Sequence, residues 1–99
     1  MQHKIQIEKI MIAFTQDENR LANSFAQRII EESNKRMFDV DTIIEDCETN
    51  ARNKMFSEPF RECMAHAAQY LRLAVKYNDR KSLELAELAV MGTMYCNLY

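Results

Sequence analysis

The sequence predicts an all-α fold, a small antiparallel bundle of four to five helices that forms a single domain over residues 1–99. Glycine and proline occur only once each, as Gly92 and Pro59, although sheet proteins depend on these residue types to reverse their strands. Residues that favour helices, such as alanine, leucine, glutamate and lysine, are abundant. A chain of 99 residues is one domain in size, and can bury a core but not a deep pocket as well.

The first segment, residues 4–14, fits two interpretations. As a strand it would alternate apolar residues at Ile5, Ile7, Ile10, Ile12 and Phe14. As a helix it would carry a stripe of Ile7, Ile10, Met11 and Phe14, with Ile5 and Ile12 on the opposite side. We favour the helix, because the sequence offers a strand no hairpin partner.

A second helix is predicted from about residue 16 to residue 35. Thr15 and Glu18 have the spacing of a capping box, in which each side chain bonds the backbone N–H of the other. The apolar face of this helix consists of Leu21, Ala22, Phe25, Ala26 and Ile29. One continuous helix over residues 4–35 is the alternative, since Ile7, Phe14 and Leu21 keep a seven-residue period. The capping box favours a break.

Asp39 or Asp41 is expected to cap a third helix that extends to about Phe56. Its apolar arc contains Val40, Ile43, Ile44, Cys47, Ala51 and Met55. Ser57 and Pro59 then predict a new helix start, because serine caps a helix and proline is tolerated in the first turn. This fourth helix runs to about Tyr77, with a wide apolar arc formed by Phe60, Cys63, Met64, Ala67, Tyr70, Leu71, Ala74 and Val75.

Asn78 and Asp79 predict a turn and the cap of a fifth helix over residues 80–97. No charged residue occurs from Leu88 to Tyr99, so most sides of this helix must be kept from water. In a domain this small we expect part of that burial to come from a partner protein or a second copy. The predicted partner-binding residues are Leu83, Ala86, Val90, Thr93, Met94 and Leu98.

An acidic cluster at the start of the third helix lacks the glycine turn of a calcium-binding loop. The simplest interpretation is that these acids offset the helix dipole, while Glu48 pairs with Arg52 at a spacing of four residues. The other interpretation is an acidic docking face for a basic partner surface, formed by Asp41, Glu45 and Glu48.

Catalytic and metal-binding motifs are not apparent, and we predict no enzyme activity, catalytic residue or cofactor. Cys63 and His66 lie three residues apart, and Cys47 or Cys96 could join them, but a zinc site needs four ligands. A helical pair of this kind also gives no oxyanion hole and no third group to orient the base. The simpler interpretation places Cys63 in the core.

The net charge of −2 argues against binding to nucleic acids or anionic membranes. A small DNA-binding transcription regulator is the alternative function, and its basic patch would have to combine Arg61, Arg72, Lys76, Arg80 and Lys81. Three widely spaced cysteines and no continuous apolar span of membrane length predict a cytoplasmic protein. The favoured function is a non-enzymatic protein–protein interaction module: a small adaptor, chaperone or inhibitor.

Overall fold

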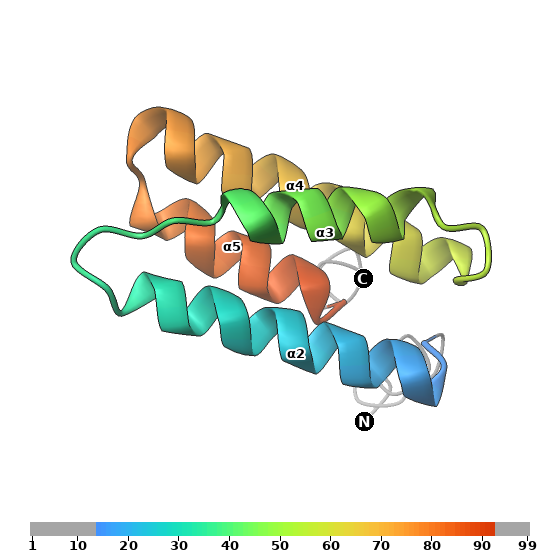
Figure 1. Cartoon of the computed structure of the whole chain (residues 1–99). Coiled ribbons are helices and arrows are strands. Elements are labelled where there is room, and N and C mark those ends of the chain that lie inside the picture. The colour runs from blue at the N-terminus through green and yellow to red at the C-terminus, as the bar shows by residue number, and fades with distance from the viewer. Residues whose placement is uncertain (1–13, 93–99) are drawn as a thin grey trace, which may run out of the picture.

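The computed structural model describes residues 14–92, and over this range the chain forms four α-helices and no strands (Figure 1). They are α2 (Gln16–Ser33), α3 (Asp41–Arg52), α4 (Glu58–Tyr77) and α5 (Arg80–Val90). The predicted all-α class is therefore confirmed, whereas the predicted helix over residues 4–14 lies, except for Phe14, outside the described residues. None of these four helices combines the length and the apolar character that crossing a bilayer requires.

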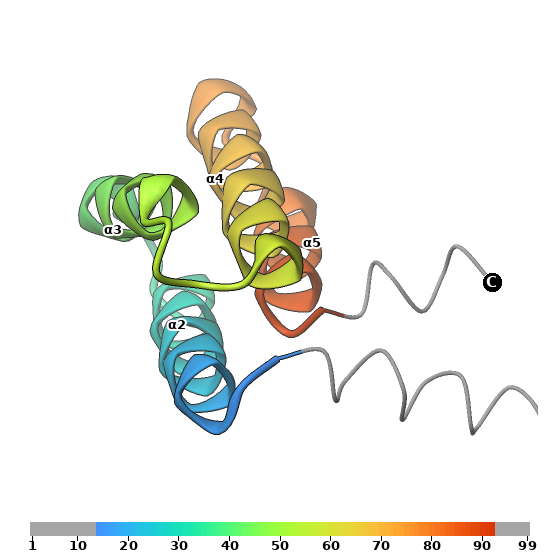
Figure 2. The same ribbon diagram turned by 90° about the vertical axis from the view of Figure 1, so that its right-hand side faces the viewer.

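Successive helices run in alternating directions, and an end-on view shows them at the four corners of a bundle (Figure 1, Figure 2). α5 packs along α4 on one side and along α2 on the other, and α3 packs on α4. α2 and α3 approach each other only briefly. One of these approaches is an ion pair, in which Arg28 of α2 donates to Asp46 of α3 at 2.9 Å. Most of the packing of α3 is nevertheless on α4.

The core is built from the apolar faces of all four helices, and most of the predicted core positions are confirmed. Burial is complete or nearly so for side chains that include Ala22, Phe25, Ile29, Val40, Ile43, Cys47, Phe60, Cys63, Met64, Ala67, Leu71 and Ala74. Leu21, Ala51 and Tyr70 of the predicted apolar faces are partly buried against the core, and two further residues are exposed. Met55 is 91% exposed because α3 ends at Arg52, and Val75 is 48% exposed at the edge of its arc.

The predicted capping box at the start of α2 is confirmed and has a third partner. The N–H of Glu18 donates to Thr15 Oγ1 at 3.1 Å, and the N–H of Thr15 donates to Glu18 Oε1 at 2.9 Å. The N–H of Ser57 donates to Glu18 Oε2 at 2.6 Å, and the Ser57 hydroxyl donates to Glu18 Oε1 at 2.8 Å. Because Ser57 is the N-cap of α4, one buried carboxylate joins the starts of two helices.

The predicted N-caps of the other helices are confirmed at α4 and α5 but not at α3. Ser57 and Asp79 cap α4 and α5 as predicted, with Pro59 in the first turn of α4. The prediction for α3 is wrong, because its N-cap is Val40, which makes no side-chain cap bond. Asp39 instead accepts the N–H of Asp41 at 3.2 Å. Val40 itself is fully buried in the core.

Arg80 holds the loop between α2 and α3 against the start of α5. Its guanidinium donates hydrogen bonds to the carbonyl oxygens of Ser33, Lys35 and Arg36 at 2.7, 2.5 and 2.6 Å. It also lies 5.3 Å from the centre of the Phe38 ring, a cation–π contact. α2 ends at Ser33, slightly earlier than predicted, and the carbonyl group of this last helical residue accepts a hydrogen bond from the distant Arg80.

We predict that Glu18→Ala lowers the free energy of unfolding by about 2–3 kcal/mol, because it removes charge-assisted hydrogen bonds at two helix starts. The matched control is Glu31→Ala, which truncates an exposed glutamate of the same helix. It should change the free energy by less than about 0.5 kcal/mol. Urea unfolding followed by circular dichroism measures both. Equal effects of the two substitutions would contradict the role given to Glu18.

The same carboxylate should make stability depend on pH. Burial is the largest single influence and raises the pKa of Glu18, but hydrogen bonds from Thr15 and Ser57 together outweigh it and lower this pKa below its usual value. A lowered folded-state pKa stabilises the fold above the unfolded-state pKa, and this contribution disappears as the pH falls through the folded-state value. Stability should therefore decline from about pH 5 downwards. In Glu18→Gln this decline should be shallower, and an unchanged slope would refute the assignment.

Candidate functional site

The predicted acidic face lies on α3 beside α4, and its three members have different roles. Asp41 and Glu45 are exposed and line a hollow between the two helices. Glu48 is half-buried, and its carboxylate forms an ion pair with the guanidinium of Arg72 on α4. This pair replaces the predicted pairing of Glu48 with Arg52, because the packing of α3 on α4 brings Arg72 within reach.

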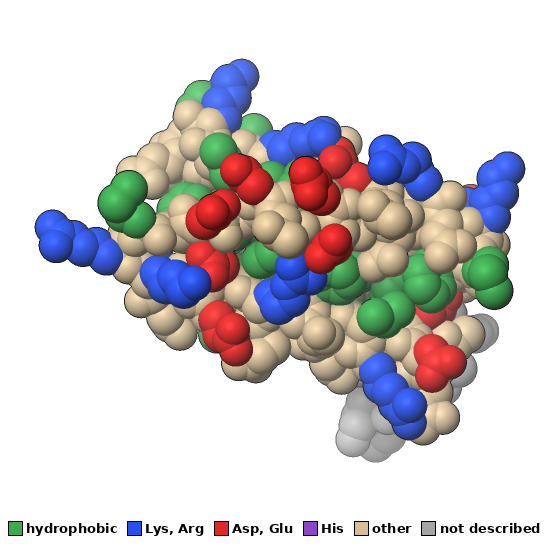
Figure 3. Space-filling view, viewed as in Figure 1, with side chains coloured by type: hydrophobic (Ala, Val, Ile, Leu, Met, Phe, Trp, Pro, Cys, Tyr) green, Lys and Arg blue, Asp and Glu red, His purple; other side chains and the backbone are tan. Residues whose placement is uncertain are grey.

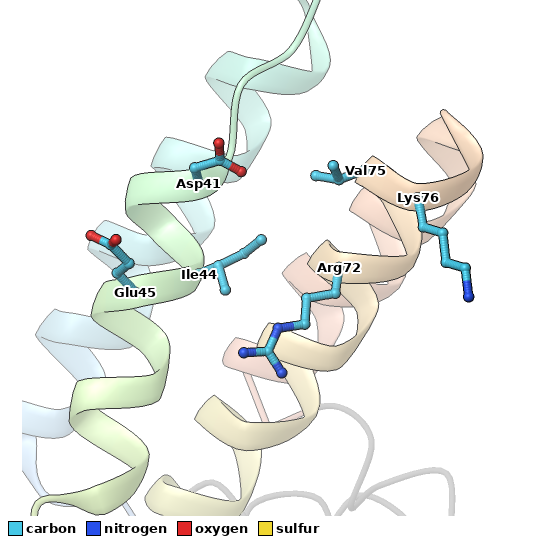
Figure 4. Close-up of a pocket in the computed structure, with 6 residues that line it drawn as sticks. All are labelled: Asp41, Ile44, Glu45, Arg72, Val75 and Lys76. Carbon is cyan, nitrogen blue, oxygen red and sulfur yellow. The ribbon is translucent and has the colours of Figure 1, made fainter.

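The hollow between α3 and α4, which we call the Val75 groove, has a volume of about 430 Å³ and opens to solvent (Figure 4). Its lining residues are Asp41, Ile44 and Glu45 of α3 and Arg72, Val75 and Lys76 of α4. Ile44 and Val75 point into the groove, and Arg72 reaches across it towards α3 (Figure 4). Glu45 and Lys76 lie on the two outer flanks (Figure 4). The result is an apolar floor between an acidic flank and a basic flank.

A second hollow continues the groove around the end of α4. It has a volume of about 200 Å³ and is lined by Arg36, Met37, Phe38, Val75 and Asn78. Val75 therefore belongs to both hollows. Met37 is 86% exposed, which makes it one of the most exposed apolar side chains of the described chain. Exposed methionines adapt their shape to a partner, so this surface suits contact with another macromolecule.

The groove charges have few partners within the described chain. No ion pair among residues 14–92 neutralises the carboxylates of Asp41 and Glu45. Lys76 lies 5.3 Å from the centre of the Tyr77 ring, a weak cation–π contact. Asp41 in the first turn of α3 and Lys76 in the last turn of α4 also complement the dipoles of their helices. Each flank thus keeps charge that a partner can meet.

The predicted partner-binding face of the last helix is corrected for the part that the structure describes. Leu83, Ala86 and Val90 are fully buried in the core of their own chain. They offer no surface in this fold, because α5 is packed by α4 on one side and by α2 on the other. Their small and apolar side chains serve packing within the bundle. The remaining predicted residues, Thr93, Met94 and Leu98, lie outside the described residues.

The two described thiols are core residues. Cys47 and Cys63 are both buried, and this burial raises the pKa of each thiol to about 12. His66 is exposed on α4, whereas Cys63 is buried. Within residues 14–92, no group of three His, Cys, Asp or Glu side chains is placed to hold a metal ion. A reactive thiolate would need a lowered pKa, the reverse of what burial produces here.

Several of the basic residues that a DNA-binding patch would need already have partners within the chain. Arg72 pairs with Glu48, and Arg80 binds the backbone of the loop after α2. Arg61 is partly buried beside α3. On the face that carries α3, acidic side chains are mixed with basic ones (Figure 3). A DNA phosphate backbone attracts a continuous basic surface, which this face does not provide.

Comparisons of the sequence and of the fold bring no relative to this argument. No protein-family model, no curated protein and no solved structure matches the chain. The site must therefore be interpreted from its residues. Sequence patterns identified Asp41 and Glu45, but they placed Val75 in the core. Its position next to Arg72 and Lys76 at the polar edge of the arc was the available signal.

We predict that neither described thiol reacts in the folded protein. In a Cys96→Ser variant, iodoacetamide should modify Cys47 and Cys63 at least about a hundredfold more slowly in native buffer than in denaturant, because burial suppresses the thiolate. Mass spectrometry of timed samples measures both rates. Rapid labelling of Cys63 under native conditions would show that this part of the core is open or that the thiol is activated.

Proposed function

We propose that this protein is a non-enzymatic protein–protein interaction module, a small adaptor, chaperone or inhibitor, and that it binds its partner through the Val75 groove. The observation that carries the proposal is an exposed apolar side chain placed between two flanks of opposite charge. Apolar contact supplies affinity in such an arrangement, and the charges orient the partner.

The energy available at the groove supports a binding role. Covering a fully exposed valine or methionine contributes about 1.5–3 kcal/mol, and Met37 and Val75 keep much of their surface for this. A specific interface normally buries more than about 1,000 Å² in total. The groove would therefore be the centre of a contact that also covers the second hollow and the outer faces of α3 and α4.

Binding fits the described residues better than catalysis does. Both described thiols have raised pKa values, which disfavours the thiolate that nucleophilic catalysis needs. The Val75 groove opens to water, whereas catalytic sites gain much of their power by excluding it. A cytoplasmic location is part of the proposal, and the buried free thiols of Cys47 and Cys63 suit a reducing compartment.

The uncharged end of the chain is a second apolar segment that a partner or a second copy would cover. From Leu88 to Tyr99 the sequence contains no charged residue, although Ala89 and Val90 already lie in the core. Burial of Thr93, Met94 and Leu98 against a partner or a second copy remains a prediction. It would add apolar contact area to that of the groove, and it does not depend on the groove for its physical basis.

The test compares Val75→Glu with Leu85→Glu, since both replace a partly exposed apolar residue by the same charged side chain. Tagged wild type and variants are isolated from native cells that also contain a differently tagged wild-type copy. Bound proteins, including that copy, are quantified by mass spectrometry. Val75→Glu should lower the capture of the principal partner at least about tenfold, a loss of 1.4 kcal/mol or more. Leu85→Glu should retain it.

Thermal unfolding of both variants establishes that each is folded before capture is compared. If folded Val75→Glu captures the same partners as wild type at the same level, the groove is not the binding surface. If Leu85→Glu loses the partner instead, the contact lies on the exposed side of α5.

A further inference from the structure

The two flanks of the Val75 groove carry opposite charge and lie on antiparallel helices. Asp41 and Glu45 occupy the α3 flank, and Lys76 and Arg72 belong to the α4 flank (Figure 4). Glu48 already partly compensates Arg72, so Lys76 is the cation left to a partner. Val75 projects between the flanks and is 48% exposed.

Two copies of the groove have complementary charges when a two-fold rotation of one kind relates them. A two-fold axis parallel to the groove places the α3 flank of one copy opposite the α4 flank of the other. Each acidic flank then faces a basic flank, and the facing helices again run in opposite directions, so their dipoles also complement each other. A two-fold axis across the groove would instead place acid against acid. The charge pattern therefore selects one symmetric arrangement.

We propose that the partner of the Val75 groove is a second copy of this chain, bound about a two-fold axis parallel to α3 and α4. This inference rests on the proposed function and specifies its partner. Glu45 of each copy faces Lys76 of the other, and the two Val75 side chains meet near the axis. The contact is isologous, so it closes as a dimer and does not extend into a filament.

Charge complementarity favours a second copy over a partner of one sign. A uniformly basic segment would be attracted by Asp41 and Glu45 but repelled by Lys76, and a uniformly acidic one would meet the converse. A second copy supplies both signs at matching positions. The net charge of −2 per chain is small, so the overall repulsion between copies is weak at physiological ionic strength.

The experiment uses charge reversal on each flank and measures dimerisation of the full chain by sedimentation equilibrium. Glu45→Lys cancels the charge of Asp41 on the α3 flank and sets a lysine against Lys76 of the other copy. Lys76→Glu cancels the charge of Arg72 on the α4 flank and sets a glutamate against Glu45 of the other copy. Each single variant should raise the dimer dissociation constant at least about tenfold, because every reversal affects two symmetric contacts. The double variant Glu45→Lys/Lys76→Glu should dimerise within about threefold of wild type, because the facing side chains at positions 45 and 76 again have opposite charge.

Mixing gives the sharper result. Equal amounts of Glu45→Lys and Lys76→Glu should form a mixed dimer more tightly than either variant dimerises alone, because every facing pair is then of opposite sign. Glu84→Lys and Lys81→Glu are the matched controls, since they make the same changes in net charge on the exposed side of α5. Both controls should dimerise as wild type does.

Three outcomes would overturn the proposal: a wild-type protein that stays monomeric at every concentration, single reversals that dimerise as wild type does, or a mixture that forms no mixed dimer. The experiments also distinguish a failure of the dimer proposal from a failure of the groove as a binding surface. If wild type is monomeric but Val75→Glu still loses a captured protein of another sequence, the groove binds that protein and only the dimer is excluded.

Discussion

Glu18 lies where α2 and α4 begin, and its carboxylate accepts hydrogen bonds from both Thr15 and Ser57. A carboxylate buried to 2% exposure is costly unless donors surround it, and the two helix starts provide those donors. Free N–H groups at a helix start in turn need acceptors. The carboxylate of Glu18 accepts hydrogen bonds at both helix starts, so both requirements are met by the same contacts. These hydrogen bonds connect two segments that are 39 residues apart in the chain. The geometry of the connection between α3 and α4 depends on this contact.

That dependence extends to the Val75 groove, because α3 packs mainly on α4 and meets α2 at few positions, among them the ion pair of Arg28 and Asp46. One end of α3 follows the loop that Arg80 binds through three carbonyl groups, and the other end leads to Ser57. With both connections held, α3 lies along α4, and the pair of Glu48 and Arg72 crosses between the two helices. The shape and charge of the groove are thus set by polar contacts at the loops as well as by the core beneath.

The buried apolar residues stabilise the fold, and a different, exposed set is available to a partner. Alanines and medium-sized apolar side chains of α5 pack against the neighbouring helices. Leu83, Ala86 and Val90 are fully buried in these contacts. Among the described residues, accessible apolar side chains include Met55 after α3, Val75 at the groove, and Leu73 and Leu85 on the exposed sides of α4 and α5. Among these, Val75 is the one flanked by opposite charges in a hollow. This combination, and not exposure alone, distinguishes the groove as a site.

The sequence by itself determined the features that depend on nearby residues. The capping box at Thr15 and Glu18, the caps at Ser57 and Asp79 and the core faces of α2 and α4 follow from spacings of three or four residues, which a helix converts directly into contacts. Only the tertiary structure decided that Glu18 also binds Ser57, that Arg80 binds the loop after α2, and that Val75 is exposed while Leu83 is buried. These outcomes depend on how the helices pack, and no local spacing encodes the distance between residues brought together from separate helices.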